Sequence, residues 1–180
     1  MSNGDNQSSK NSTSQSTSQS KSNSKTLIIY FSLSGNTKKA AEQIKKDTGA
    51  DIIRLQPKKA YPKGYDNYVP VAQRQLKQNI HPTIKTEIPN LSDYETVLIG
   101  FPTWWQQPPM IIHSLFEKFD FAGKTIVPFT TSMSTPISSS MSYMRKLAKD
   151  DNAKINNGFR YADNNQKLRQ FLQKNNLLKD

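Results

Sequence analysis

The feature that most constrains the fold is a regular alternation, from Thr26 onward, of apolar strand-like stretches with amphipathic helix-like stretches. The apolar stretches predict strands over 27–31, 51–55, 96–101, 125–130 and, more weakly, 154–161. Helical spacing predicts helices over 37–47, from near Pro70 to 76, over 110–119, 137–148 and 168–172. Since parallel strands need long crossover connections, we predict an α/β fold: a five-stranded, doubly wound parallel sheet between two helical layers.

Residues 2–25 contain only Ser, Asn, Gln, Thr, Lys, Gly and Asp. Such a segment cannot contribute to a core, so we expect a disordered leash over 1–25 and one domain over 26–180. The leash is similar to the tether of exported lipoproteins in Gram-positive bacteria. As written, the chain has no secretory signal and suggests a cytoplasmic protein. We hypothesise instead an extracytoplasmic, lipid-tethered form in which Met1 replaces a signal and an anchor cysteine.

Composition excludes several kinds of chemistry. The chain has no cysteine, so it has no disulfide, no thiolate metal site and no cysteine nucleophile. Its two histidines, His81 and His113, are too few and too far apart in the sequence to predict a metal site. No stretch of the sequence approaches the roughly 20 apolar residues of a membrane-spanning helix.

The formal net charge is +11 at pH 7, and most of it falls on the predicted domain. We interpret it first as a well-charged surface. The more specific alternative is that the positive charge attracts the chain to an anionic lipid, polymer or nucleic acid. Because no basic stripe is interleaved with aromatic residues, we do not expect nucleic-acid binding.

The loop after the first predicted strand is typical of an anion site. It reads Ser32-Leu33-Ser34-Gly35-Asn36-Thr37 and leads directly into a predicted helix. Hydroxyls, backbone N–H groups and the helix N-terminus can converge there on a phosphate. The loop has neither the spacing of a nucleotide-hydrolysing P-loop nor that of a dinucleotide-binding fingerprint. The alternative is an ordinary turn with Thr37 as helix N-cap.

Two further loops follow central strands, and ligands of open parallel sheets bind at the carboxyl ends of such strands. One contains both tryptophans of the chain, Trp104 and Trp105, and an indole there could stack on a flat ring. Only one of these two neighbours can lie flat on the same ring, and the alternative is one core indole beside a chance surface aromatic. The other loop covers residues 131–136.

With these loops in place, the chain resembles the flavodoxin-like family, in particular short bacterial flavodoxins and flavin-dependent quinone reductases. The first loop is similar to the family pattern [ST]-x-[ST]-G-[NH]-[TS], and residues 100–105, Gly-Phe-Pro-Thr-Trp-Trp, to G-[YF]-P-x-W-W. The resemblance runs from Lys25 to the C-terminus and includes the segment 119–129. It implies a flavodoxin-like fold that binds FMN non-covalently.

The resemblance also implies which residues would contact FMN. The phosphate would be held by Ser32, Ser34, Gly35, Asn36 and Thr37. The isoalloxazine would be flanked by Pro102, Thr103, Trp104 and Trp105, with Gln106 near its N5 atom, and its other side would be closed by Thr131, Ser132, Met133 and Ser134. The expected function is electron transfer or reduction of a small acceptor such as a quinone, without a catalytic side chain.

The chain departs from the family at two places. Met133, Ser134 and Pro136 fall where the third loop usually has glycines, and Gln106 replaces a small residue, often Gly. These departures favour an alternative function, a non-redox extracytoplasmic binding module with a degraded flavin pocket. The basic charge leads us to expect an acidic redox partner, if that partner is a protein, and a flavin potential above that of the typical acidic flavodoxins.

Overall fold

The computed structural model describes residues 25–180. Its elements alternate as predicted, with one short 3₁₀ turn, η1 (Leu91–Asp93), before the third strand. The strands are β1 (Thr26–Tyr30), β2 (Asp51–Arg54), β3 (Thr96–Pro102), β4 (Thr125–Thr131), β5 (Lys154–Ile155) and β6 (Phe159–Arg160). The helices are α1 (Asn36–Thr48), α2 (Tyr65–Gln78), α3 (Met110–Lys118), α4 (Ser138–Asp150) and α5 (Asn165–Lys174).

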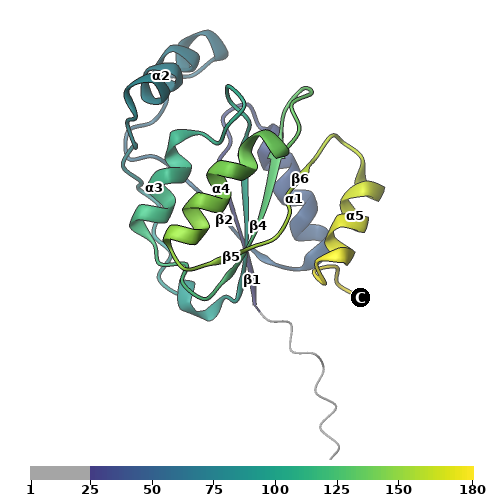
Figure 1. Cartoon of the computed structure of the whole chain (residues 1–180). Helices are drawn as coiled ribbons and strands as arrows, with labels where there is room; N and C mark the ends of the chain where they lie inside the picture. Colours follow the sequence, from purple (N-terminus) through teal and green to yellow (C-terminus); the bar gives the residue numbers. More distant parts are fainter. Residues whose placement is uncertain (1–24) are drawn as a thin grey trace, which may run out of the picture.

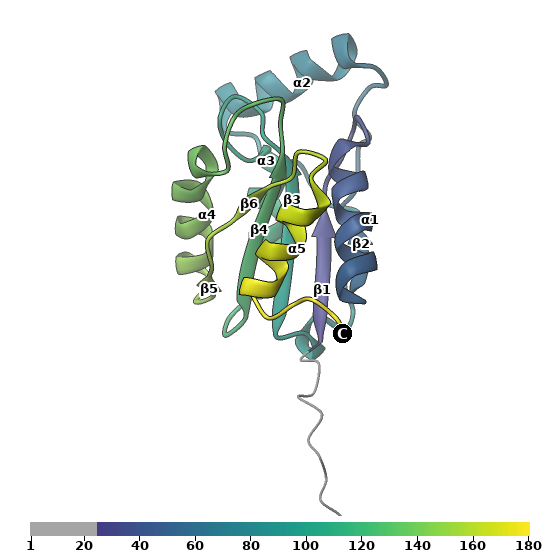
Figure 2. The same cartoon turned by 90° about the vertical axis from the view of Figure 1, so that its right-hand side faces the viewer.

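All strand pairs are parallel, in the order β2-β1-β3-β4-β5, with β6 also paired to β4. The order reverses next to β1, which is the arrangement of flavodoxin-like doubly wound sheets. Figures 1 and 2 show the sheet between two helical layers, one of α1 and α5 and the other of α3 and α4. The predicted α/β/α fold is therefore confirmed.

The near-continuous apolar strands are explained by burial on both faces of the sheet. Leu27 and Ile29 of β1 belong to the core beneath α3 and α4, whereas Ile28 belongs to the core beneath α1 and α5. All three side chains are 0% exposed. Side chains of a strand alternate between faces, so one apolar run supplies both cores.

The prediction of a single last strand over 154–161 was only partly right, because two short strands with a break between them occupy this stretch. Pro128 of β4 lies opposite that break. The carbonyls of Ile126 and Thr130, on either side of it, accept hydrogen bonds from Asn156 and Tyr161. Proline has no N–H to donate to a neighbouring strand. At Pro128 this costs no hydrogen bond, because the position faces the break between β5 and β6.

The predicted start of the second helix was wrong. Helix α2 begins at Tyr65, five residues before Pro70, which lies inside it. The helix also does not cover a face of the sheet. In both views it lies beyond the carboxyl ends of the strands, across the end where the predicted site falls (Figures 1 and 2).

The leash predicted over 1–25 lies, except for Lys25, outside the described residues. Within residues 25–180, no helix combines the length and apolar character needed to cross a bilayer.

Candidate functional site

The first loop and the start of α1 form a cradle, which we define as residues 32–37. Gly35 is the N-cap of α1, and its φ of 94° lies in the left-handed region that favours glycine. Its N–H donates to Ser32 Oγ at 3.2 Å, which curls the loop back on itself. Thr37 lies inside the helix and is not its N-cap, so the alternative of an ordinary Thr-capped turn is wrong.

The N-terminus of α1 is left open toward a ligand. No side chain caps the helix, and the N–H groups of Thr37 and Lys38 have no acceptor among residues 25–180. Thr37 is only 1% exposed, so water reaches its N–H poorly, whereas Lys38 is exposed. Unsatisfied N–H groups at a helix start, under loop hydroxyls, match the donors that a phosphate requires.

The second loop is a tight hairpin at the end of β3. The N–H of Trp104 donates to the carbonyl of Gln107 at 3.1 Å, and the N–H of Gln107 donates back to Trp104 at 3.2 Å. Trp105 and Gln106 form the tip with φ values of 50° and 64°. Two positive φ values in a two-residue hairpin define a type I′ turn, which favours glycine or asparagine. This explains why a small residue is common after the Trp pair and why Gln106 is strained there.

Side-chain hydroxyls bind the three loops together. Thr37 Oγ1 and Thr131 Oγ1 are 2.6 Å apart in a buried contact between the cradle and the end of β4. Thr103 Oγ1 lies 2.7 Å from Thr130 Oγ1, and the N–H of Thr103 donates to the carbonyl of Thr131 at 3.0 Å. The predicted residues therefore meet at one edge of the sheet. We call the cradle, residues 102–106 and residues 131–134 together the rim.

Two arginines that sequence reasoning missed hold the rim from outside. Arg160 of β6 donates from Nε to Ser132 Oγ at 2.9 Å and from Nη2 to the carbonyls of Ser132 and Met133 at 2.9 and 2.6 Å. Arg54 of β2 donates from Nη2 to the carbonyl of Ser32 at 2.8 Å. The guanidinium of Arg160 thus anchors the third loop where the family has glycines, and Met133 beside it is 99% exposed.

Trp104 and Trp105 have different environments. Trp104 is half-buried, and its ring packs edge-on against Phe31 and Tyr61, with centroid distances of 5.6 and 6.1 Å. It stacks on Tyr68 of α2 at 5.9 Å with an interplanar angle of 25°. Trp105 is 42% exposed at the hairpin tip. The two indoles therefore differ in burial, and the expectation that only one of them lies flat on a bound ring stays a prediction.

Helix α2 contributes to the site because of its position over the rim. Tyr65, Tyr68, Val69 and Ala72 from α2 line a cavity of about 230 Å³ whose other wall is Thr103, Trp104 and Trp105. The apolar spacing of these α2 residues predicted a helix, but nothing local in the sequence indicated that the helix would lie over this end of the sheet.

The phenols near the rim stay protonated at neutral pH. Burial raises the pKa of Tyr61 to about 12, and its protonated hydroxyl donates to Gln75 Oε1 at 2.6 Å. Burial, and then the neighbouring Tyr65, raise the pKa of Tyr68. These tyrosines therefore offer aromatic surface with protonated hydroxyls.

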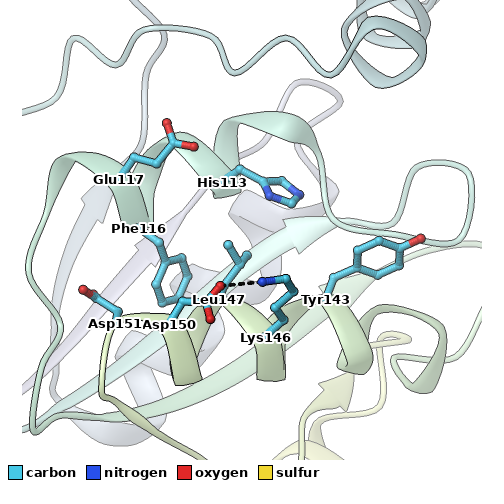
Figure 3. A pocket seen from close by; sticks show the side chains of 8 residues that line it. All are labelled: His113, Phe116, Glu117, Tyr143, Lys146, Leu147, Asp150 and Asp151. Atoms are coloured by element: carbon cyan, nitrogen blue, oxygen red, sulfur yellow. Dashed lines mark hydrogen bonds and ion pairs between the residues drawn. The ribbon is translucent and has the colours of Figure 1, made fainter.

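A different cavity, of about 320 Å³, lies between α3 and α4 and is lined by none of the predicted site residues (Figure 3). Lys146 Nζ donates there to Asp150 Oδ2 at 2.7 Å. His113, which lines it, stacks on His81 with a centroid distance of 5.1 Å, so the two histidines meet in space despite their separation in sequence. Even so, residues 25–180 contain no group of three or more His, Asp or Glu side chains placed to hold a metal ion.

The chain matches the family model described as Flavodoxin over residues 25–175. That match spans all five helices and the whole rim. The fold and the arrangement of its strands define the class of a doubly wound, flavodoxin-like α/β protein. The chain belongs to the flavodoxin family.

Solved structures agree with this assignment. A protein from Bacteroides eggerthii assigned as a flavoprotein is 30% identical over 83% of this chain and 96% of its own, with a TM-score of 0.74. A flavoprotein from Lactobacillus acidophilus in complex with FMN is 26% identical over 76% of this chain and 93% of its own, with a TM-score of 0.67. An archaeal flavodoxin, 14% identical over 82% of this chain and 92% of its own, has a TM-score of 0.52 and shows the fold alone. No curated protein matches the chain.

Proposed function

We propose that this chain binds FMN non-covalently at the rim and uses it to carry electrons or to reduce a small acceptor such as a quinone. The observation that carries the proposal is the open N-terminus of α1: unpaired N–H groups of Thr37 and Lys38 beneath the hydroxyls of Ser32 and Ser34. A relative of similar fold, 26% identical, is described as a flavoprotein in complex with FMN.

The residues of the rim fit the two ends of this cofactor. The cradle offers N–H and O–H donors and a helix dipole, which suit a phosphate. Thr37 Oγ1 can accept from Thr131 and still donate its own proton to a phosphate oxygen, since either hydroxyl can be the donor in that contact. The second and third loops flank the space where the ring would lie, with Trp105 and Met133 both exposed at their tips.

When bound, FMN supplies one- and two-electron transfer, and the protein supplies grip, orientation and electrostatics. Arg160 keeps the backbone of the third loop in place. The net positive charge of the chain favours negative charge on a reduced flavin, so its potential is expected to exceed that of acidic flavodoxins. The same charge favours an acidic partner if electrons pass to or from a protein.

The test compares FMN with riboflavin, which lacks the phosphate, by titrating the purified protein and following flavin fluorescence. A hydrogen bond to a charged acceptor contributes about 1.5–3 kcal/mol. Ser34→Ala should therefore weaken FMN binding about ten- to a hundredfold and leave riboflavin binding unchanged. Ser138→Ala, an exposed serine at the start of α4, is the matched control. Equal losses for both flavins would contradict the assignment of the cradle.

A binding module without redox function is the second candidate, and the exposed side chain of Met133 in place of a glycine favours it. The two functions separate once FMN is titrated. Bound FMN that is reduced by dithionite and reoxidised by a soluble quinone supports the redox function. Failure to bind FMN at any accessible concentration would favour the binding module instead.

A further inference from the structure

A separate cavity opens on the β2 side of the cradle. It has a volume of about 450 Å³, within the range of small-molecule sites. Its floor includes Phe31 and Tyr61, and its wall toward the rim includes Ser32. Phe31 and Tyr61 also pack against Trp104, so an aromatic wall separates this cavity from the second loop.

The rest of the cavity is built from two segments that are far apart in the sequence, the one after β2 and the one before η1. Backbone hydrogen bonds join them. The N–H of Lys58 donates to the carbonyl of Thr83, and the N–H of Lys85 donates to the carbonyl of Gln56, both at 2.8 Å. These bonds hold Lys58 and Lys85 beside the same opening without any ligand.

The charged residues that line this cavity are all basic. Arg54, Lys58, Lys63 and Lys85 line it, and no Asp or Glu is among its lining residues. None of the four forms an ion pair with another residue in the range 25–180. The cavity between α3 and α4 is different, since its lysine and histidine face three carboxylates.

This concentration of charge is local to one part of the chain. Residues 54–85 contain seven Lys and Arg but a single acidic residue, Asp66. All four basic side chains that line the cavity are exposed. Their like charges repel each other around one opening, although water and salt weaken this repulsion. A bound anion removes that repulsion and gains charge-assisted hydrogen bonds.

We propose that this cavity is a second ligand site, specific for a small organic anion with at least two negative charges, such as a phosphorylated or polycarboxylate metabolite. Arg54, whose Nη2 also donates to the Ser32 carbonyl, offers its remaining N–H groups to a phosphate or carboxylate, and the three lysines offer point charges around it. Phe31 and Tyr61, which are 1% and 9% exposed, close the floor of the cavity. The site adjoins the cradle, since Ser32 and Leu33 also line the cavity, but none of its four basic residues belongs to the rim.

The experiment uses isothermal titration calorimetry on the full chain at constant ionic strength, with sodium pyrophosphate and sodium citrate as probes. The expected result is saturable one-to-one binding of at least one probe. The double variant Lys63→Gln/Lys85→Gln should weaken it at least tenfold, since each lost charged contact is worth about ten- to a hundredfold. The matched control is Lys46→Gln/Lys174→Gln, which removes two exposed, unpaired lysines from α1 and α5 and so gives the same net charge.

Two results would overturn the proposal: no saturable binding of either probe, or an equal loss of binding in both double variants. If neither small probe binds but polyglutamate does, the cavity is instead part of a surface for an acidic macromolecule. FMN titration of the same variants separates this site from the proposed flavin site. Lys63→Gln/Lys85→Gln should leave FMN affinity unchanged, whereas Ser34→Ala should leave anion binding at the second site unchanged. Thermal unfolding of each variant verifies that it folds.

Discussion

The contact between Thr37 and Thr131 offers the sharpest test of how the rim is assembled. The two hydroxyl oxygens are 2.6 Å apart, and the residues are 1% and 7% exposed. Thr→Val preserves shape and removes only the hydroxyl. Thr131→Val leaves the Thr37 hydroxyl buried without its partner, which should lower the free energy of unfolding by about 1–3 kcal/mol. For a chain of this length, each 1 kcal/mol corresponds to a fall in Tm of about 2–4 °C.

The double variant makes the prediction specific. In Thr37→Val/Thr131→Val neither hydroxyl remains to be left unsatisfied, so the loss should be smaller than the sum of the two single losses. We expect a coupling energy of about 1 kcal/mol, measured by urea unfolding of all four proteins without flavin. Strictly additive losses would refute the reasoning, because they would mean that the two hydroxyls do not depend on each other.

The flavin affinity of the same proteins separates structure from binding. The double variant should lose less stability than the sum of the single losses, but its FMN affinity should stay as low as that of Thr37→Val, because Thr37 is also a proposed phosphate donor. Fluorescence titration should show FMN binding weakened about tenfold or more, with riboflavin binding little changed. An FMN affinity in the double variant equal to that of the unmodified protein would show that Thr37 does not donate to the phosphate.

Three further predictions concern positions outside that contact. Gly100→Ala would place a Cβ only 2.1–2.7 Å from ring atoms of Phe129, so it should lower the free energy of unfolding by about 1–3 kcal/mol, and adding Phe129→Leu should restore part of the loss in urea unfolding. Gln106→Gly should raise thermal stability by roughly 0.5 kcal/mol, because the φ of 64° costs a side-chain residue more than glycine loses in chain entropy. Burial, and then the neighbouring His81, lower the pKa of His113 in the folded chain. As the pH drops below 6.5, the usual pKa of histidine, the unfolded chain therefore binds this proton more readily than the folded chain, and the free energy of unfolding should fall. His113→Leu should make this fall smaller when unfolding is measured as a function of pH.

Each of these has a control and a contrary outcome. If Phe129→Leu restores nothing, the clash is not the cause of the loss at Gly100. Gln107→Gly, beside the turn, should destabilise, and equal effects at Gln106 and Gln107 would show that the left-handed turn is not responsible. A pH dependence that persists unchanged in His113→Leu would place the titrating group elsewhere.

Much of the fold was predictable because its signals are local. Runs such as Leu27–Phe31 and Thr96–Phe101 are too apolar for any position except the middle of a sheet covered on both faces. The first loop was recognisable from its hydroxyl and glycine residues, and its place after a central strand predicted the edge of the sheet on which it lies. The start of α2 was misplaced because Pro70 was taken as a first-turn residue, whereas the helix tolerates it one turn later.

The parts that were missed are contacts between residues far apart in the chain. Arg160 has no sequence signal for its role, because that role depends on a break in the last strand that brings β6 beside the end of β4. His81 and His113 seemed isolated until the segment after α2 brought one ring over the other. The basic cavity needs both Arg54 and Lys85, which hydrogen bonds between two distant loops place together.

The sequence by itself determined the class of fold and the chemistry available at the carboxyl edge of the sheet, since hydrophobic period, turn residues and the order of loops are properties of neighbouring residues. Only the tertiary structure decided how that edge is closed: α2 lies across it, Trp104 is enclosed by aromatic rings, and a threonine pair joins the cradle to β4. The physical reason is that side-chain packing and hydrogen bonds between distant segments depend on the relative positions of whole elements, which no local pattern encodes.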